Sequence, residues 1–400
     1  MGNEKKKSGM GMLAKVLVAI AIGAGVGWCM GQCGAVGDTV MRILKTFNVF
    51  FAQILKFIVP LLILGLVTPA IADVGKGAGK MLLFVALASY VSTVFAAFFG
   101  WFCAGELLPH YLGPGVFSTA GNGKEFLPFF TLKIPPLCDV LTALAISFMC
   151  GIGIVFTGSE RLRGVFNDFG GIIKLTILRV IIPGLPIYIA TMFAEMTASG
   201  KFSVLAGTMC KVIGTGWALT ICFLVVVYTI AGIIVRKNPL KCLYNMANAY
   251  FTGLSIASSS AVIPVTLQCC EKNGISTDIR NFVVPLCANI HMPGSAVKLM
   301  TSFFAISIIY GQQWPFAQVA NFVFLFAIAA VAAPGVMGGV LMASLGLLET
   351  VLGFTSEQTA MMMAFYLSLD GYGPATNVTS DGMIALLTDR FFGKNLKDKE

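Results

Sequence analysis

The chain has 400 residues, of which 57% are hydrophobic and 11% are charged, whereas soluble globular domains carry about 25% charged residues. This composition excludes an ordinary soluble domain and indicates a protein whose solvent is mostly lipid. The net charge of +9 does not indicate nucleic-acid binding, because the basic residues lie in short loops between apolar runs. With 11 Cys, no CxxC pair and two His, we expect neither a disulfide framework nor a structural metal site.

Ten apolar runs follow one another along the chain. A spanning helix needs about 20 residues, so the longer runs hold a tilted helix or more than one element. The first run lacks a small-residue cleavage site, so we expect a spanning helix there and not a removed signal. The runs cover residues 11–32, 40–72, 80–106, 134–157, 169–198, 204–235, 242–268, 281–310, 316–352 and 358–388.

Basic loop residues set the expected orientation of these runs. They gather before run one, after runs two, four and six, again between runs seven and eight (Lys272 and Arg280), and at the C-terminus. The positive-inside rule therefore places both termini and both ends of run seven in the cytoplasm. Runs seven and nine must then enter and leave on one side, which predicts two re-entrant hairpins. These two runs each contain a helix breaker, over 258–264 in run seven and over 332–335 in run nine. Such interrupted segments are typical of the solute site of a transporter; two ordinary kinked helices are the alternative.

Run ten carries two carboxylates, Asp370 and Asp381, inside an apolar segment. Each is costly in a membrane unless it is paired or hydrated, which predicts a functional role. Their spacing is about three helical turns and places both on one face of a single helix, with Asn377 and Ser380 on or near that face. This set of oxygen atoms suits an ammonium group, a small cation or both. A helix-end position is the alternative for Asp381.

Run eight carries two further unusual residues, His291 and Lys298, on either side of Pro293-Gly294. The Pro-Gly pair predicts a helix break that frees carbonyl groups for a cation and opens a helix N-terminus to an anion. His291 can change its charge near neutral pH. Snorkelling toward the nearer interface is the alternative for Lys298.

These motifs resemble the dicarboxylate/amino acid:cation symporter family, the glutamate-transporter-like carriers, over nearly the whole chain. The segments that carry the resemblance are 258–266, 289–295, 333–335 and 370–381, and the last is the most specific. The resemblance implies an all-α polytopic membrane protein with eight transmembrane helices and two re-entrant helical hairpins arranged as inverted repeats. It further implies an elevator-type transporter that assembles as a homotrimer in the plasma membrane (the inner membrane of a bacterium).

The resemblance also implies a division into two domains. Residues 1–72 and 107–200 would form a scaffold, and residues 73–106 and 201–400 would form a transport domain. Within the transport domain, hairpin one would cover about 242–270 and hairpin two about 316–352. The seventh and eighth transmembrane helices would cover about 277–310 and 356–392.

The resemblance assigns the solute site residue by residue. Asp370 would bind the substrate amino group, Asn377 its α-carboxylate, and Ser295 would lie near its side chain. The remaining substrate-binding positions would be Ser259, Ser260, Gly373, Pro334 and Lys298. No catalytic residue is expected, because the implied activity is transport and not an enzymatic reaction.

The resemblance assigns sodium sites as well. Asp381 would bind one Na+ with carbonyl groups of Cys287, His291 and Asn377. Hydroxyl groups of Ser92 and Thr93 match a third site, although hydroxyls in apolar helices usually join helices to each other. A second site would use carbonyl groups of Asn289, Ala327, Ile328 and Ala330.

Two departures from the family pattern bear on substrate and ion. Positions where carriers of acidic solutes place an arginine hold Gly373 and Ala257, which favours a small neutral amino acid such as serine, threonine or alanine. Lys298 can supply a positive charge instead, so a dicarboxylate or acidic amino acid is the alternative. Pro293 and His291 replace two side chains of the third sodium site, and a proton can then take the place of one Na+. A channel is less consistent with the sequence, since no repeated filter motif occurs. An intramembrane protease is also less consistent, since both carboxylates lie on one run and not on two facing helices.

Overall fold

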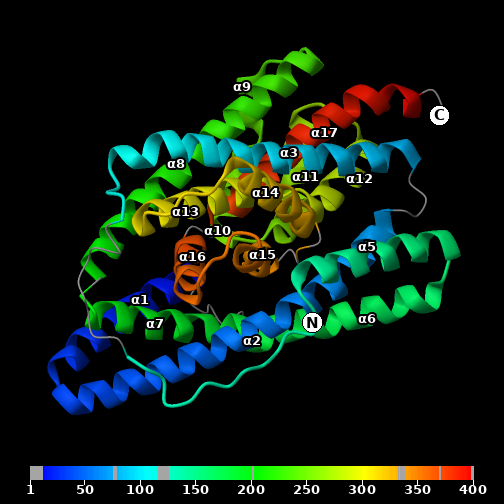
Figure 1. Cartoon of the computed structure of the whole chain (residues 1–400). Helices are drawn as coiled ribbons and strands as arrows, with labels where there is room; N and C mark the ends of the chain where they lie inside the picture. Colours follow the sequence, from blue (N-terminus) through cyan, green and yellow to red (C-terminus); the bar gives the residue numbers. More distant parts are fainter. Residues whose placement is uncertain are drawn as a thin grey trace, which may run out of the picture.

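The computed structural model describes residues 12–74, 79–115, 126–200, 202–331, 333, 338–368 and 371–397. Within these residues every element of regular secondary structure is a helix (Figure 1). Six helical stretches are long and apolar enough to cross a bilayer. The chain is therefore an all-helical polytopic membrane protein with several apolar spans, as the sequence predicts. The stretches are Lys15–Gln32, Gly34–Pro69, Lys80–His110, Glu160–Ala198, Gly207–Val235 and Thr277–Tyr310.

One set of helices packs around α2, which pairs with α1, α5, α6 and α7. The 41 residues of α2 extend about 60 Å, twice the thickness of a bilayer core, so this helix is longer than one straight crossing requires. Figure 1 shows α1, α2, α6 and α7 along one side of the molecule. The set comprises α1 (Met12–Gln32), α2 (Gly34–Val74), α5 (Val140–Thr157), α6 (Glu160–Thr176), the π-helical turn η2 (Ile177–Ile181) and α7 (Ile182–Ala198).

The second set packs around α13 and α17, which contact each other and α3, α8 and α12. In α13, 15 of the 18 residues are buried, so this helix forms the interior of the set. The set comprises α3 (Gly79–Leu107), η1 (Leu108–His110), α8 (Phe202–Val235), α9 (Pro239–Asn245), α10 (Ala247–Ile256), α11 (Ser259–Lys272), α12 (Thr277–Ile290), α13 (Pro293–Tyr310), α14 (Phe316–Val331), α15 (Gly339–Thr350), α16 (Ser356–Ser368) and α17 (Tyr372–Lys397). Apart from η1, which falls in the expected scaffold range 107–200, the two sets cover the ranges expected for scaffold and transport domain, and that functional division stays a prediction.

Runs seven and nine are each interrupted, as their sequences predict. In run seven, α10 ends at Ile256 and is capped by Ala257, which takes a left-handed conformation with φ of 54°. The next helix, α11, starts at Ser259 and packs against α10. In run nine, α14 and α15 also pack against each other. Both pairs are helical hairpins, and their re-entrant insertion in the bilayer stays a prediction.

Run eight breaks two residues earlier than the Pro-Gly pair suggests. The α12 helix ends at Ile290, His291 and Met292 are non-helical, and Pro293 is the first residue of α13. Proline is favoured at this position because its missing N–H would be unpaired there in any case. The break therefore leaves His291 on extended backbone between two half-helices.

The expectation that run ten is one helix is wrong. The α16 helix ends at Ser368 and Gly371 lies in a turn, and α17 begins at Tyr372. Asp370 itself lies outside the described residues, so the predicted common helical face for Asp370 and Asp381 lies outside them too. Gly371 and Pro374 explain the interruption, because glycine favours turns and proline cannot donate a helical hydrogen bond.

Candidate solute and ion site

The break between α12 and α13 lies against α17, and glycine permits the close approach. A Cβ atom on Gly294 would overlap the Thr376 side chain and the carbonyl oxygen of Gly373. Only a residue without a side chain fits at this point. The N-terminus of α13, whose first N–H groups have no partner within their own helix, is thereby held directly against α17.

Asn377 of α17 occupies that helix N-terminus. Its Oδ1 accepts hydrogen bonds from the backbone N–H of Gly294 at 2.8 Å and of Ser295 at 3.3 Å. Its Nδ2 donates to Ser295 Oγ at 3.2 Å and contacts Met292 Sδ at 3.3 Å. The amide oxygen thus satisfies the first N–H groups of α13 at the positive end of the helix dipole, and the NH2 group of Asn377 is the donor that this position offers to a carboxylate.

Asp381 lies one helical turn further along α17, fully buried. Its Oδ1 is 2.9 Å from Nδ1 of His291, and Nε2 of His291 is 2.9 Å from Ser92 Oγ in α3. The second carboxylate oxygen, Oδ2, has no hydrogen-bond partner among the described residues. A buried carboxylate oxygen without a partner is costly, and carboxylate oxygen is a preferred ligand of hard cations. This atom therefore fits a small cation.

The carbonyl ligands expected around Asp381 already take part in the fold. The carbonyl of Cys287 accepts from the backbone N–H of His291 at 2.9 Å, and that of Asn377 accepts from Ser380 Oγ at 2.9 Å. A carbonyl oxygen has a second lone pair, so these bonds leave capacity for an ion. Their role as sodium ligands stays a prediction.

The hydroxyl groups expected at the third sodium site are bound by protein atoms. Ser92 Oγ is paired with His291. Thr93 Oγ1 donates to the carbonyl of Ser89 at 2.9 Å and accepts from the N–H of Met292 at 3.4 Å. The His291 ring thus lies where α3, the helix break and α17 meet, and it forms a hydrogen bond with the hydroxyl of Ser92.

Several other predicted residues lie apart from this centre. Ser259 is buried and Ser260 is exposed at the start of α11, and among the described residues no hydrogen bond joins either serine to Asn377. Hairpin one nevertheless packs closely on α17, because a Cβ atom on Gly253 would lie 2.9 Å from Cα of Ala375.

The expected second sodium site is spread over α12 and α14, which contact each other. Asn289 is exposed, and its Nδ2 donates to the carbonyl of Pro285 at 2.9 Å. Ala327 and Ala330 are buried, and Ile328 is half-buried. Pro334 and Asp370 lie outside the described residues.

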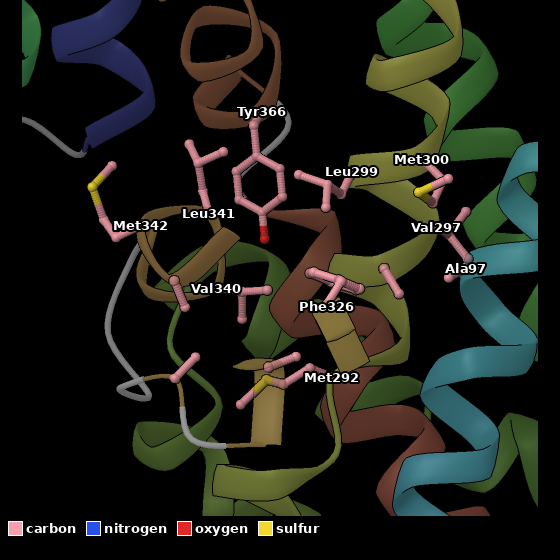
Figure 2. Close-up of a cluster of buried hydrophobic side chains, with 14 of the residues drawn as sticks. Ala97, Met292, Val297, Leu299, Met300, Phe326, Val340, Leu341, Met342 and Tyr366 are labelled. Atoms are coloured by element: carbon pink, nitrogen blue, oxygen red, sulfur yellow. The ribbon is translucent and has the colours of Figure 1, made fainter. Parts of the chain in front are cut away.

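Lys298 of α13 is buried next to the site. Its Nζ lies 3.5 Å from the centroid of the Tyr366 ring in α16, and only 1% of the residue is exposed. The ammonium therefore does not reach an interface, and the snorkelling alternative is wrong. Figure 2 shows Tyr366 projecting from α16 into an apolar cluster beside Leu299 and Leu341.

Tyr366 and Met292 contact site residues, yet sequence reasoning assigned neither a role, although Met292 lies in segment 289–295. Tyr366 is one aromatic residue in an apolar run, and Met292 is one methionine of 19. Their roles depend on packing between elements far apart in the chain, which local patterns do not encode.

A buried carboxylate beside a broken helix, with two helical hairpins nearby, is typical of a polytopic secondary carrier. The chain belongs to the sodium:dicarboxylate symporter family, which matches residues 12–391.

Curated relatives agree with this assignment. The chain is 31% identical to excitatory amino acid transporter 3 of Mus musculus over 183 residues, or 46% of this chain and 35% of the relative. It is 24% identical to excitatory amino acid transporter 4 of Mus musculus over 298 residues, or 70% and 51%. A putative sodium-dependent excitatory amino acid transporter of Caenorhabditis elegans, glt-4, is 25% identical over 254 residues, or 62% and 50%. The chain thus spans about a third to a half of these relatives.

Proposed function

We propose that this chain is a sodium-coupled symporter that takes up a small solute with a carboxylate group. The observation that carries the proposal is the buried Asp381, whose Oδ2 has no partner among the described residues, one helical turn from Asn377 at the N-terminus of α13. The carboxylate of Asp381 suits a cation, and the position at Asn377 suits an anion. Both lie on α17, next to the buried helix α13.

The coupling follows from this proximity. A sodium ion at Asp381 offsets the cost of the buried negative charge and adds positive potential next to the carboxylate position at Asn377. Each ligand then strengthens binding of the other, since a coupling free energy between two sites is reciprocal. A loaded site has little net charge, which lowers the cost of carrying it across the apolar layer.

The side chain of the solute and the oligomer are finer parts of this proposal. Gly373 and Ala257 stand where an arginine would bind a second carboxylate, which supports a small neutral amino acid. The position of Lys298 supports a dicarboxylate or acidic amino acid instead. Elevator movement of the second helix set against the first, a homotrimer, and a plasma-membrane location with cytoplasmic termini complete the proposal.

Thermal unfolding of purified protein tests the function even while the solute is unidentified. A panel of neutral amino acids, acidic amino acids and C4 dicarboxylates is added in sodium buffer and in choline buffer. We expect at least one solute to raise the melting temperature in sodium and to do so much less in choline, by mass action. A panel in which no solute stabilises the protein, or in which sodium makes no difference, would contradict the proposal.

Proton coupling is the alternative, and the contact of His291 with Asp381 is the observation that favours it. A pH profile of uptake compares the parent with His291→Gln. An unaltered pH profile in His291→Gln would exclude proton coupling through this residue. Uptake that persists in choline but requires a proton gradient would show that protons, and not sodium ions, drive transport.

A further inference from the structure

We propose that Tyr228 of α8 is a positioning residue for the ion site: its hydroxyl group fixes the turn of α17 that carries Asp381 and thereby raises the affinity of that site for sodium. Tyr228 lies in an apolar run and is not among the residues expected to bind solute or sodium. The inference rests on the proposed function, because it concerns the ion ligand Asp381.

The contact between Tyr228 and α17 is a buried hydrogen bond. The Oη atom of Tyr228 donates to the carbonyl oxygen of Thr379 at 2.7 Å, and only 1% of each residue is exposed. Thr379 lies midway along the chain between Asn377 and Asp381. A buried hydroxyl that finds its partner on another helix stabilises one relative position of the two helices, because a shift of either helix would leave the hydroxyl unpaired away from water.

Gly382 lets Tyr228 come this close to α17. A Cβ atom on Gly382 would lie 2.8 Å from Oη of Tyr228 and 2.7 Å from Cε of Met246. Met246 is fully buried between α9 and α10, and Gly382 directly follows Asp381. The missing side chain at 382 therefore allows α8 and the start of hairpin one to pack on the turn that carries the carboxylate.

The other hydroxyl groups of this turn do not hold it against a neighbouring helix. Oγ1 of Thr379 and Oγ of Ser380 donate to carbonyl groups within α17 itself. Bonds of this kind stay inside one helix and often bend it, so they leave its position relative to other helices open. Tyr228 supplies a bond from outside α17.

Asp381 depends on this support more than Asn377 does. Asn377 is held by the backbone N–H groups of Gly294 and Ser295 and by the Ser295 hydroxyl. Among the described residues, the carboxylate of Asp381 has a single hydrogen-bond partner, His291. The place of the carboxylate is therefore set mainly by the backbone that Tyr228 holds, and loss of the Tyr228 hydroxyl should weaken sodium more than solute.

The test compares the parent with Tyr228→Phe, which keeps the ring and removes the hydroxyl. Thermal unfolding at constant ionic strength, with choline replacing sodium, gives the sodium concentration for the half-maximal rise in melting temperature. We expect this concentration to rise about two- to tenfold, the contribution of one hydrogen bond. Affinities for aspartate, succinate and serine at saturating sodium should change by less than about twofold. Thr229→Val is the matched control, because the exposed Thr229 hydroxyl donates within α8.

A second variant, Gly382→Ala, tests the same contact from α17. Its methyl group would overlap the Tyr228 hydroxyl and should also raise the sodium concentration for half-maximal stabilisation. Introduced into Tyr228→Phe, the same substitution should have a smaller effect than in the parent, because residues in contact do not act additively. Fold-changes that multiply in the double variant would overturn the inference.

The remaining outcomes separate the inference from the function on which it rests. A lower melting temperature of Tyr228→Phe without sodium, together with the parental half-saturation by sodium, would show that Tyr228 only stabilises the fold and would overturn the inference. Equal losses of affinity for sodium and for the solutes at saturating sodium would also overturn it. A parent whose melting temperature does not respond to sodium would overturn the proposed function itself, and the inference with it.

Discussion

The substitution Asp381→Asn tests the ion site in isolation from the solute. Asparagine keeps the shape of the side chain, and its carbonyl oxygen can still accept a hydrogen bond from His291. The negative charge is lost, together with the oxygen that has no partner among the described residues. Removing a buried ionic partner typically costs 2–5 kcal/mol or more of binding free energy, which weakens sodium about 30-fold to several thousand-fold.

The expected size of the effect follows from mass action. At a sodium concentration of about ten times the parent dissociation constant, sodium stabilises the folded protein by about 1.4 kcal/mol. With affinity about 100-fold weaker, the same sodium stabilises the variant by less than about 0.1 kcal/mol. In a chain of this size the first value corresponds to a rise of about 2 °C in melting temperature, and the second to no measurable rise.

The assay is thermal unfolding in detergent over a series of sodium concentrations, with choline keeping the ionic strength constant. Asp278→Asn is the control, because Asp278 is exposed in the first turn of α12 and should leave the sodium shift unchanged. A sodium-dependent rise in Asp381→Asn equal to that of the parent would refute the assignment of Asp381 as the ion ligand.

Two further predictions concern the packing around this centre. Gly294→Ala should abolish uptake and lower the free energy of unfolding by about 1–3 kcal/mol, because the added methyl group overlaps the Thr376 side chain. The control is Gly214→Ala, whose methyl group meets no atom within 4 Å. This control should leave the melting temperature unchanged or raise it. Ser92→Ala should leave the sodium dependence of uptake unaltered, because its hydroxyl is already bound to His291, and a large rise in the sodium concentration needed for half-maximal uptake would show instead that Ser92 binds the ion.

Local patterns predict much of the architecture. Composition and run lengths indicate a polytopic helical protein, and run seven is interrupted at Ala257 and Ser258, at the edge of the predicted breaker 258–264, whose Pro264 lies inside α11. Of the second predicted breaker, over 332–335, only residue 333 is among the described residues. These features depend on residues close together in the chain, whose turn and helix preferences act without help from the rest of the fold. The Pro-Gly pair places the break in run eight two residues too late, since proline belongs to the first turn of the new helix.

Run ten shows where local patterns fail. Its continuous apolar character predicts one helix, yet α16 and α17 are separated at Gly371. The length of an apolar run does not distinguish one helix from two when both are buried in protein. The long polar stretch at the start of α17 is tolerated because the protein interior, and not lipid, surrounds it.

Contacts within the site could not be predicted from spacing. His291 meets Ser92 and Asp381 from 199 and 90 residues away, and Lys298 meets Tyr366 across two helices. The sequence identifies His291, Lys298 and Asp381 as unusual because charge is costly in a membrane. Which of them pair is decided by the packing of α3, α13, α16 and α17.

The central claim is that sodium drives uptake through the site at Asp381. Its most direct measurement is uptake of radiolabelled aspartate, succinate and serine into proteoliposomes that contain the purified protein. We predict that an inward sodium gradient accumulates at least one of these solutes above its external concentration, and that Asp381→Asn abolishes the accumulation. Accumulation that is the same when choline replaces sodium, or that persists in the variant, would contradict the account.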